Sequence, residues 1–425
     1  MAAITFFKTT ASIAVFLLKK VWPSWYNEHT MVFSFFKKDK QDDSLALLLD
    51  IGSGSVGGAL VHLEVGKAPH VIATAREDIS FQDALSSARF LASMLVALEN
   101  VLKDMQKKTK NGHVPGHIFC TLSSPWFILK TRHLRIVREN PFKVTNESLE
   151  GFFEEDIAHL KEELNETLPS KDVAIIEKRI LQIRLNGYEI KNPYGKTTDK
   201  IELTTTVSVS SERVVQNIKH KIAQFFHTTS LSFGVFPLAA FSAVRDIFPE
   251  EQNFLFVDIT GEATDVSLVS HDLLLGTISF PYGKNFFIRE LSSALHTVHE
   301  EAATLFKMFL TGTLDGLKHK KVEEVVMRTE EEWRGRFEKS LQALLTLGAL
   351  PDKVFFTADT DMAPFSLGLI GGLKSEITRV NAFEIQHLDQ FIATNFVTFE
   401  SEVLRDPFLV IEALLATKAL SPHNK

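Results

Sequence analysis

Two short segments of this chain combine the residue types that a phosphate-binding turn needs. Residues 47–61 read LLLDIGSGSVGGALV, and residues 255–269 read LFVDITGEATDVSLV. Each has an apolar run, an Asp-Ile pair, a turn of small or polar residues and a second apolar run. Glycine and serine let backbone N–H groups approach an anion closely, because no bulky side chain intervenes. An aspartate at the end of the first run can hold a hydrated Mg²⁺ that in turn binds phosphate.

The repeated Asp-Ile context favours two hairpins that face each other and clamp a nucleotide between two lobes. The alternative is a pair of ordinary hairpins with glycine-rich turns. In that case each aspartate would form a turn and accept hydrogen bonds from N–H groups of its own loop. Either hairpin alone would favour the ordinary interpretation, and the repeat makes the nucleotide clamp the preferred hypothesis.

The composition limits the kinds of function that this chain can have. Its 425 residues are enough for two or more domains, and its hydrophobic fraction of 45% is typical of a globular protein. The formal net charge of −7 offers no general attraction to nucleic acid. Cys120 is the only cysteine, so the sequence allows no internal disulfide and no cysteine-based metal site. The histidines form no H-E-x-x-H motif, which argues against that class of zinc enzyme.

The N-terminal region contains the most apolar stretch, at residues 11–18, followed by Lys19 and Lys20. This run is shorter than the ~20 residues that a membrane helix needs. It is interpreted as a membrane-surface anchor, a degenerate export signal, or sequence translated upstream of the true start. We favour the third, because Met31 opens a plausible native N-terminus just before the first expected strand. The expected location is the cytoplasm, with peripheral contact at the inner face of the cell membrane as an addition.

The elements around the two hairpins alternate between strands and helices. Strand signals begin at residue 45, and residues 86–108 have apolar positions at helical spacing. The second half restarts at residue 254 with a hairpin, another strand and then helices as far as residue 347. This order predicts an α/β fold with two lobes of related topology.

The chain is therefore expected to have five parts. Residues 113–200 differ in texture from the rest, with strands and an acidic helix that predict a small α+β insert. The parts are an N-terminal extension at 1–43, a first lobe at 44–112 and 201–235, the insert at 113–200, a second lobe at 236–385, and a C-terminal tail at 386–425.

These motifs resemble those of the actin-like ATPase superfamily, whose members have a duplicated, ribonuclease H-like two-lobe fold. The resemblance covers roughly residues 44–385. Within the superfamily, the chain is most similar to the bacterial cell-division protein FtsA, and next to its pilus-assembly relative PilM. The insert stands where FtsA carries its extra, SHS2-type subdomain. The matching segments are DIGSGS at 50–55, NPYGK at 192–196, PLA at 237–239, DITGEATD at 258–265 and FPYGKN at 280–285.

The resemblance implies ATP and Mg²⁺ as ligands and gives roles to residues of both turns. Asp50 and Asp258 would hold Mg²⁺ through water. Backbone N–H groups of the two turns would bind the phosphates, and Asp265 would orient a water or a hydroxyl. The candidate cofactor-binding residues are Asp50, Gly52, Ser53, Gly54, Ser55, Asp258, Gly261, Thr264 and Asp265.

Three departures from the family pattern weaken the expected ATP site. Gly57 stands where many relatives carry Lys or Gln. Thr260 and Glu262 replace two glycines, and Glu262 brings a carboxylate near the phosphates unless Mg²⁺ or a lysine compensates. Residues 357–360, TADT, replace a glycine-rich adenosine motif, and Asp359 or Thr360 is expected to cap a helix instead. We therefore expect ATP to bind weakly or as a structural ligand.

Three functions compete on these observations. The first is an FtsA-like scaffold at the cytoplasmic membrane face; the resemblance implies self-association and contact with a tubulin-like division protein. The second is a PilM-like component of type IV pilus assembly, whose insert binds a peptide from a membrane protein. The third is an active kinase or ATPase. A kinase needs a base beside the substrate hydroxyl, and we identify no dedicated catalytic residue for that role.

Overall fold

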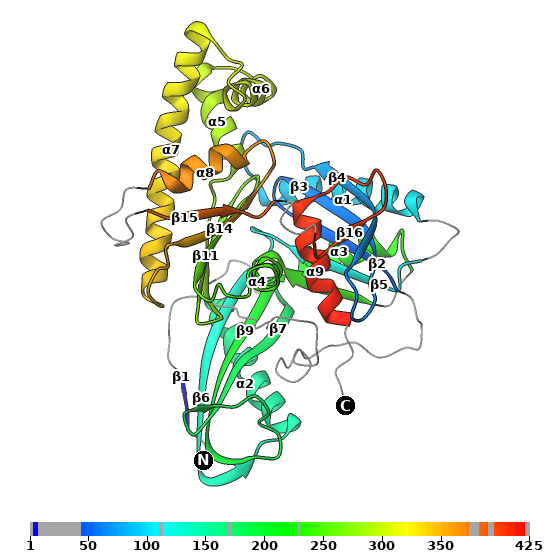
Figure 1. The fold of residues 1–425 in the computed structure, drawn as a ribbon, viewed down its shortest axis with the longest axis vertical. Coiled ribbons are helices and arrows are strands. Elements are labelled where there is room, and N and C mark those ends of the chain that lie inside the picture. Colours follow the sequence, from blue (N-terminus) through cyan, green and yellow to red (C-terminus); the bar gives the residue numbers. More distant parts are fainter. Residues whose placement is uncertain are drawn as a thin grey trace.

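The computed structural model describes residues 3–6, 44–109, 114–167, 172–227, 230–373, 382–389 and 395–420. Within these residues the strands form three sheets (Figure 1). Each sheet and the helices packed on it make one part of the molecule. We call these parts the first lobe, the second lobe and the insert subdomain. The predictions for residues 7–43, including Met31 as the true start, lie outside the described residues.

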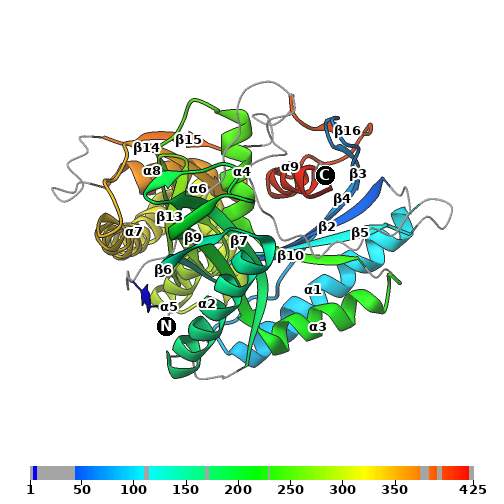
Figure 2. The ribbon, with the colours of Figure 1, turned by 90° about the horizontal axis from the view of Figure 1, so that it is seen from below.

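The first lobe is built on a sheet with the strand order β10-β5-β2-β3-β4-β16. Strands β2, β3 and β4 pair antiparallel, and β5 pairs parallel with both β2 and β10. Helices α1 and α3 lie on one side of this sheet and α9 on the other (Figure 2). The elements are β2 (Leu45–Ile51), β3 (Ser55–His62), β4 (His70–Asp78), α1 (Ser87–Lys108), β5 (His117–Leu122), α3 (Glu212–Ala223), β10 (Leu231–Val235), α4 (Phe236–Ile247), β16 (Thr398–Phe399) and α9 (Pro407–Leu420).

Local sequence explains how the central strand and the first helix pack. Strand β2 is buried along its whole length, which its unbroken apolar run requires once helices cover both faces. The amphipathic helix expected at residues 86–108 is confirmed as α1. Its apolar stripe packs closely on β3, where a Cβ at Gly58 would lie 2.5 Å from the Val101 side chain. The stripe consists of the buried residues Phe90, Leu91, Met94, Ala97, Leu98, Val101, Leu102 and Met105.

The second lobe repeats the arrangement of the first. Its sheet has the strand order β13-β12-β11-β14-β15, in which β11 pairs antiparallel with β12 and parallel with β14. Strand β2 pairs with β3 and β5 in the same way. The duplication expected from the two hairpins is therefore confirmed. The elements are β11 (Phe254–Ile259), β12 (Thr264–Ser270), β13 (Leu273–Phe280), α5 (Lys284–Leu295), α6 (His299–Leu310), α7 (Gly316–Leu345), β14 (Lys353–Ala358), α8 (Ala363–Gly371) and β15 (Glu384–His387).

The insert subdomain, residues 128–211, is a sheet with the strand order β1-β6-β9-β7-β8 and one covering helix, α2. Its elements are β6 (Ile128–Lys143), α2 (Asn146–Thr167), β7 (Val173–Leu185), β8 (Tyr188–Glu189) and β9 (Thr197–Ser211), with β1 (Ala3–Phe6) added at the edge. These limits differ from the expected 113–200. Strand β5 joins the first-lobe sheet through β2, and β9 runs past residue 200 within the insert sheet.

The C-terminal segment returns to the first lobe. Strand β16 pairs with β4, and α9 packs against α4 and β2. Leu409, Ile411 and Ala413 of α9 are buried in the same core as β2 and α1. The described end of the region expected as a tail is thus part of the first-lobe core.

Candidate functional site

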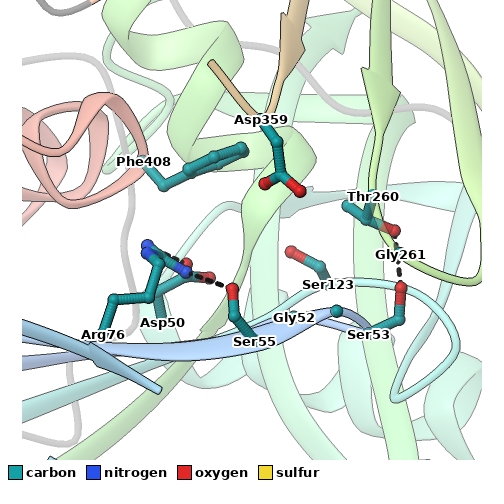
Figure 3. A pocket seen from close by; sticks show the side chains of 11 residues that line it. Asp50, Gly52, Ser53, Ser55, Arg76, Ser123, Thr260, Gly261, Asp359 and Phe408 are labelled. Carbon is teal, nitrogen blue, oxygen red and sulfur yellow. Dashed lines mark hydrogen bonds and ion pairs between the residues drawn. The ribbon is translucent and has the colours of Figure 1, made fainter. Parts of the chain in front are cut away.

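The two Asp-Ile hairpins face each other across the junction between the lobes, as the sequence predicts. Between them lies a cavity of about 20 Å³, drawn in Figure 3. Asp50, Gly261 and the turn at 52–55 line this cavity. Asp258, Thr264 and Asp265 do not, because they are buried deeper in the second lobe. The lining residues are Asp50, Gly52, Ser53, Gly54, Ser55, Arg76, Ser123, Thr260, Gly261, Asp359 and Phe408.

The turns of the two hairpins are in direct contact. The Oγ of Ser53 lies 2.6 Å from Oγ1 of Thr260, and it accepts a hydrogen bond of 2.8 Å from the N–H of Glu262. Gly54 and Gly261 pack backbone against backbone, so a Cβ on Gly261 would lie 2.7 Å from the backbone nitrogen of Gly54. The Ser53 side chain thus occupies an N–H group of the second turn that an anion would otherwise reach.

Asp50 is paired with an arginine that the sequence did not single out. The Nη2 of Arg76, on β4, donates to Oδ2 of Asp50 at 2.7 Å. The same guanidinium donates to both carboxylate oxygens of Asp406, at 2.5 and 3.0 Å, and to Oγ of Ser55 at 2.8 Å. It also lies over the ring of Phe408, 5.2 Å from the centroid. One cation therefore joins β2, β3, β4 and the start of α9.

Burial and charge act in opposite directions on this cluster. Burial raises the pKa of Asp50 above its ordinary value, and the nearby Arg76 offsets part of that effect. Burial alone would lower the pKa of Arg76, but Asp406 and Asp50 raise it overall. Glu412 of α9 is a third buried acid, and burial followed by the charge of Asp50 raises its pKa well above the ordinary range. The site therefore favours a charged Arg76 and a protonated Glu412.

Asp258 and Asp265 form a second buried pair, opposite each other on β11 and β12. Thr357 donates to Oδ1 of Asp258 at 2.7 Å, and Ser124 donates to Oδ1 of Asp265 at 2.6 Å. The other oxygen of Asp258 has no hydrogen-bond partner among the described residues. Burial raises the pKa of both carboxyls, and for Asp258 the charge of Asp265 adds to the shift. Protonated carboxyls are poor ligands for Mg²⁺, which favours anionic oxygen.

The remaining residues of the second turn are held by their own lobe. The hydroxyl of Thr264 donates to the carbonyl of Tyr282 at 2.7 Å, away from the cavity. Glu262 is only 5% exposed, and its carboxylate accepts hydrogen bonds from Arg289 at 2.5 Å and Asn285 at 2.8 Å. The positive charge that the sequence demanded beside Glu262 is thus an arginine of α5.

The region expected to hold adenosine is bridged by a salt bridge. Lys284, at the start of α5, lies 2.8 Å from Asp361 and 3.4 Å from Asp359. The prediction that Asp359 or Thr360 caps the following helix is wrong. Met362 is the N-cap of α8 without a side-chain bond, and Asp359 contributes only its backbone carbonyl.

Several residues of the site carried no signal in the sequence. Arg76 lies in an ordinary polar strand end, and Asp406 is 330 residues away from it. Trp126 donates a buried hydrogen bond of 2.7 Å from Nε1 to the carbonyl of Gly52, which helps to hold the first turn in place. The Asp-Pro pair at 406–407 was the available signal for a helix start, and Asp406 does accept from the N–H groups of Phe408 and Leu409.

Comparison with known proteins places this geometry in a known fold. No protein-family model matches the chain, and no curated protein matches its sequence. Among solved structures, a PilM-PilN type IV pilus biogenesis complex is similar with a TM-score of 0.58 and 15% identity, covering 89% of this chain and 99% of that chain. The protein has an actin-like, two-lobed ATPase fold.

Two further solved structures match the chain at lower similarity. The ethanolamine utilization protein EutJ from Carboxydothermus hydrogenoformans has a TM-score of 0.42 and 12% identity, over 89% of this chain and 91% of its own. MreB 5 of Spiroplasma citri, bound to AMPPNP, has a TM-score of 0.40 and 10% identity, over 88% and 96%.

The cavity between the two turns is too small for a nucleotide in the conformation described. A cavity needs about 10–15 Å³ to hold one water molecule, and the space here is about 20 Å³. The phosphate turns touch each other, and Arg76 covers Asp50. ATP and Mg²⁺ stay predictions that require the two turns to separate.

Proposed function

We propose that this chain is a non-enzymatic, actin-fold scaffold whose insert subdomain binds an extended segment of a partner protein. The observation that carries the proposal is the pairing of β1 with β6. Residues 3–6 add to the insert sheet as an antiparallel strand opposite residues 134–137. The edge of β6 therefore has the backbone geometry to accept an extended chain, and strand addition of this kind is a common way of binding peptides.

The face of the sheet beside this edge is basic. Glu202 of β9 is directly opposite Arg135 of β6 and Arg184 of β7. Lys200 also reaches Glu202, at 2.7 Å, and this contact lowers the pKa of the Glu202 carboxyl first, with Arg135 and Arg184 adding to it. Three cations surround Glu202, and Glu189 of β8, opposite Arg184, is a second carboxylate, so cations outnumber carboxylates on this face. Arg135 and Arg184 are exposed. This favours a partner segment that carries acidic side chains.

The similarity to the PilM-PilN complex supports the choice of a protein partner. That structure is named for a complex between two proteins of type IV pilus biogenesis, and this chain covers 99% of the matched chain. We infer a PilM-like role, with a peptide of a membrane protein as the partner. The FtsA-like role, with a tubulin-like partner and self-association, remains a prediction that no feature of the site favours over it.

The proposed location follows from the proposed partner. Among the described helices, none is long and apolar enough to cross a membrane. A segment of a membrane protein would recruit the scaffold to the cytoplasmic face of the membrane, where contact with lipid itself is not required.

A peptide of residues 1–12 of this chain is the probe that tests the edge. We would label it and titrate it with the full chain and with an Ile4→Pro variant, because proline cannot donate to a ladder and weakens the internal strand. We expect saturable binding that is tighter for Ile4→Pro. Glutamate at peptide position 5, opposite Arg135, should tighten binding further.

The matched variants for this experiment exchange charge on the two faces of the insert subdomain. Arg135→Glu should abolish the gain from the peptide glutamate. Lys161→Glu, on the exposed surface of α2, should leave it unchanged. If neither the full chain nor Ile4→Pro binds the peptide, the proposed edge is wrong.

A further inference from the structure

The base of the interlobe cavity holds an unusual balance of charges. Asp50 is 3% exposed and Glu412 is also 3% exposed, and Asp406 lies beside them at the start of α9. These acids come from β2 and from both sides of Pro407, so they belong to segments far apart in the chain. Arg76 is the cation that pairs with Asp50 and Asp406. Without it, buried carboxyl groups would face one another at high cost.

The guanidinium fits this place with little freedom. Its Nε and Nη2 hold Asp406 in a two-pronged contact, and the same Nη2 reaches Asp50. Gly57, opposite Asp50 on β3, provides the room, because a Cβ there would lie 2.6 Å from Nη2 and 2.9 Å from Cζ. The hydrogen bond from Arg76 to Oγ of Ser55 also connects the guanidinium to the end of the first turn.

The same turn is the one that meets the second lobe. Gly54 contacts Gly261 and Ser53 contacts Thr260, one and two residues before Ser55. On the other side of the turn, the carbonyl of Gly54 accepts a hydrogen bond from the N–H of Ile79, just beyond β4. Arg76 therefore holds the first turn in the position from which it touches the second.

We propose that Arg76 is a built-in cation that takes the place of a metal-bound nucleotide at the base of the cleft and keeps the lobes closed without one. It neutralises Asp50, joins β4 to the start of α9, and positions Ser55 so that the two turns meet. The closed state then needs neither ATP nor Mg²⁺. This inference concerns the cleft and stands independently of the peptide edge on the insert subdomain.

The response of the protein to divalent cations should then depend on the side chain of Arg76. In the wild-type full chain, thermal unfolding should be the same with EDTA, with Mg²⁺ and with Mg-ATP at millimolar concentration. Arg76→Ala should unfold at a lower temperature and should regain stability when Mg²⁺ is added, because Asp50 and Asp406 are then left without their cation. A ligand that binds only the folded state raises the unfolding temperature by mass action.

Two further variants separate the role of the cation from damage to the fold. Gly57→Ala keeps every charge but forces the guanidinium away from Asp50, so it should gain part of the Mg²⁺ response even if Arg76→Ala does not fold. Arg328→Ala removes an arginine that is 56% exposed and paired with Glu290, and it should gain none.

The proposal is overturned if Mg-ATP raises the unfolding temperature of the wild-type chain. It is also overturned if Mg²⁺ does not raise the unfolding temperature of either Gly57→Ala or Arg76→Ala. Saturable binding of Mg-ATP to the wild type in a calorimetric titration would have the same meaning. In that case the turns separate readily and the cleft is an ordinary nucleotide site.

Discussion

Gly54 and Gly261, one from each Asp-Ile hairpin, pack backbone against backbone at the junction of the two lobes. A Cβ on Gly261 would overlap the backbone of Gly54, and a Cβ on Gly54 would lie 3.1 Å from Cα of Gly261, closer than an ordinary contact. The hydrogen bond from Glu262 N–H to Ser53 Oγ lies beside this contact and is buried. The two turns can therefore approach this closely only because both positions are glycine. The contact joins the two Asp-Ile hairpins that the sequence suggested as a phosphate clamp.

Gly261→Ala should weaken this junction. The new methyl group meets backbone atoms, which cannot rotate away, so the loops must separate and lose the Ser53 contacts. We expect a loss of about 1–3 kcal/mol in the free energy of unfolding, measured with urea. Gly335→Ala is the matched control, because a Cβ there meets nothing within 4 Å and Gly335 lies within helix α7. It should stabilise by about 0.5–1 kcal/mol. Equal effects of both substitutions would contradict the tight junction.

Features that depend on local pattern were predictable from the sequence. The hairpins, helix α1 and strand β7 follow from runs of apolar residues and their periodicity. Strand β10 has no such signal, because LSFGV runs directly into the apolar start of α4 with no turn residue between them. Helix α9 was expected as part of a tail, because its apolar residues lie on all sides and show no amphipathic period.

The contacts that close the cleft could not be predicted in the same way. The bonds of Arg76 to Asp406, and of Ser53 to Thr260, join residues 330 and 207 positions apart. A single sequence carries no signal for such pairs, because an arginine at a strand end is usually solvated. For Glu262, the sequence predicted only part of the interaction. The need for a compensating cation was clear, but the cation is an arginine a full helix turn into α5.

Removing one partner of the Glu262–Arg289 pair should destabilise the folded protein strongly. Glu262 is buried, and Arg289 also donates to the carbonyl of Gln82 in the first lobe at 3.4 Å. Arg289→Ala should therefore destabilise by about 3–5 kcal/mol, since it leaves a buried carboxylate with only Asn285. Glu262→Gln together with Arg289→Ala should be less destabilising than Arg289→Ala alone.

A double-mutant cycle in urea would measure this coupling. Arg328→Ala, which breaks the exposed pair with Glu290, serves as the control and should cost no more than about 1 kcal/mol. If Arg289→Ala and Arg328→Ala have the same effect, Glu262 is not dependent on its arginine.

Asp258 should make the protein less stable as the pH rises. Its pKa in the folded state is raised by burial and by Asp265, with Asp50 and Asp359 adding to the shift. Between the ordinary aspartate value of about 3.9 and that raised value, the folded state binds more protons than the unfolded state. The stabilising effect of the proton is complete below the ordinary pKa and is lost as the pH rises through the folded pKa.

Asp258→Asn removes this titration while its side-chain oxygen can still accept from Thr357. The free energy of unfolding of the variant, relative to wild type, should therefore increase steadily from pH 4 to pH 8. Urea unfolding at several pH values would measure it, with Asp104→Asn on the surface of α1 as a reference for the loss of one carboxylate. Parallel pH profiles for wild type and Asp258→Asn would show that Asp258 does not hold its proton.

ATP hydrolysis should be absent, because the groups that could support it are already engaged. Asp50 is bound by Arg76, and Asp258 and Asp265 lie outside the cavity and accept hydrogen bonds from Thr357 and Ser124. Phosphate release from Mg-ATP should stay at the background rate for the full chain, and Asp50→Ala should not change it. An active ATPase or kinase would show steady release that falls in Asp50→Ala. Release that is unchanged by Asp50→Ala but removed by further purification would point to a contaminating enzyme, and it would leave the scaffold as the function that agrees with the closed cleft.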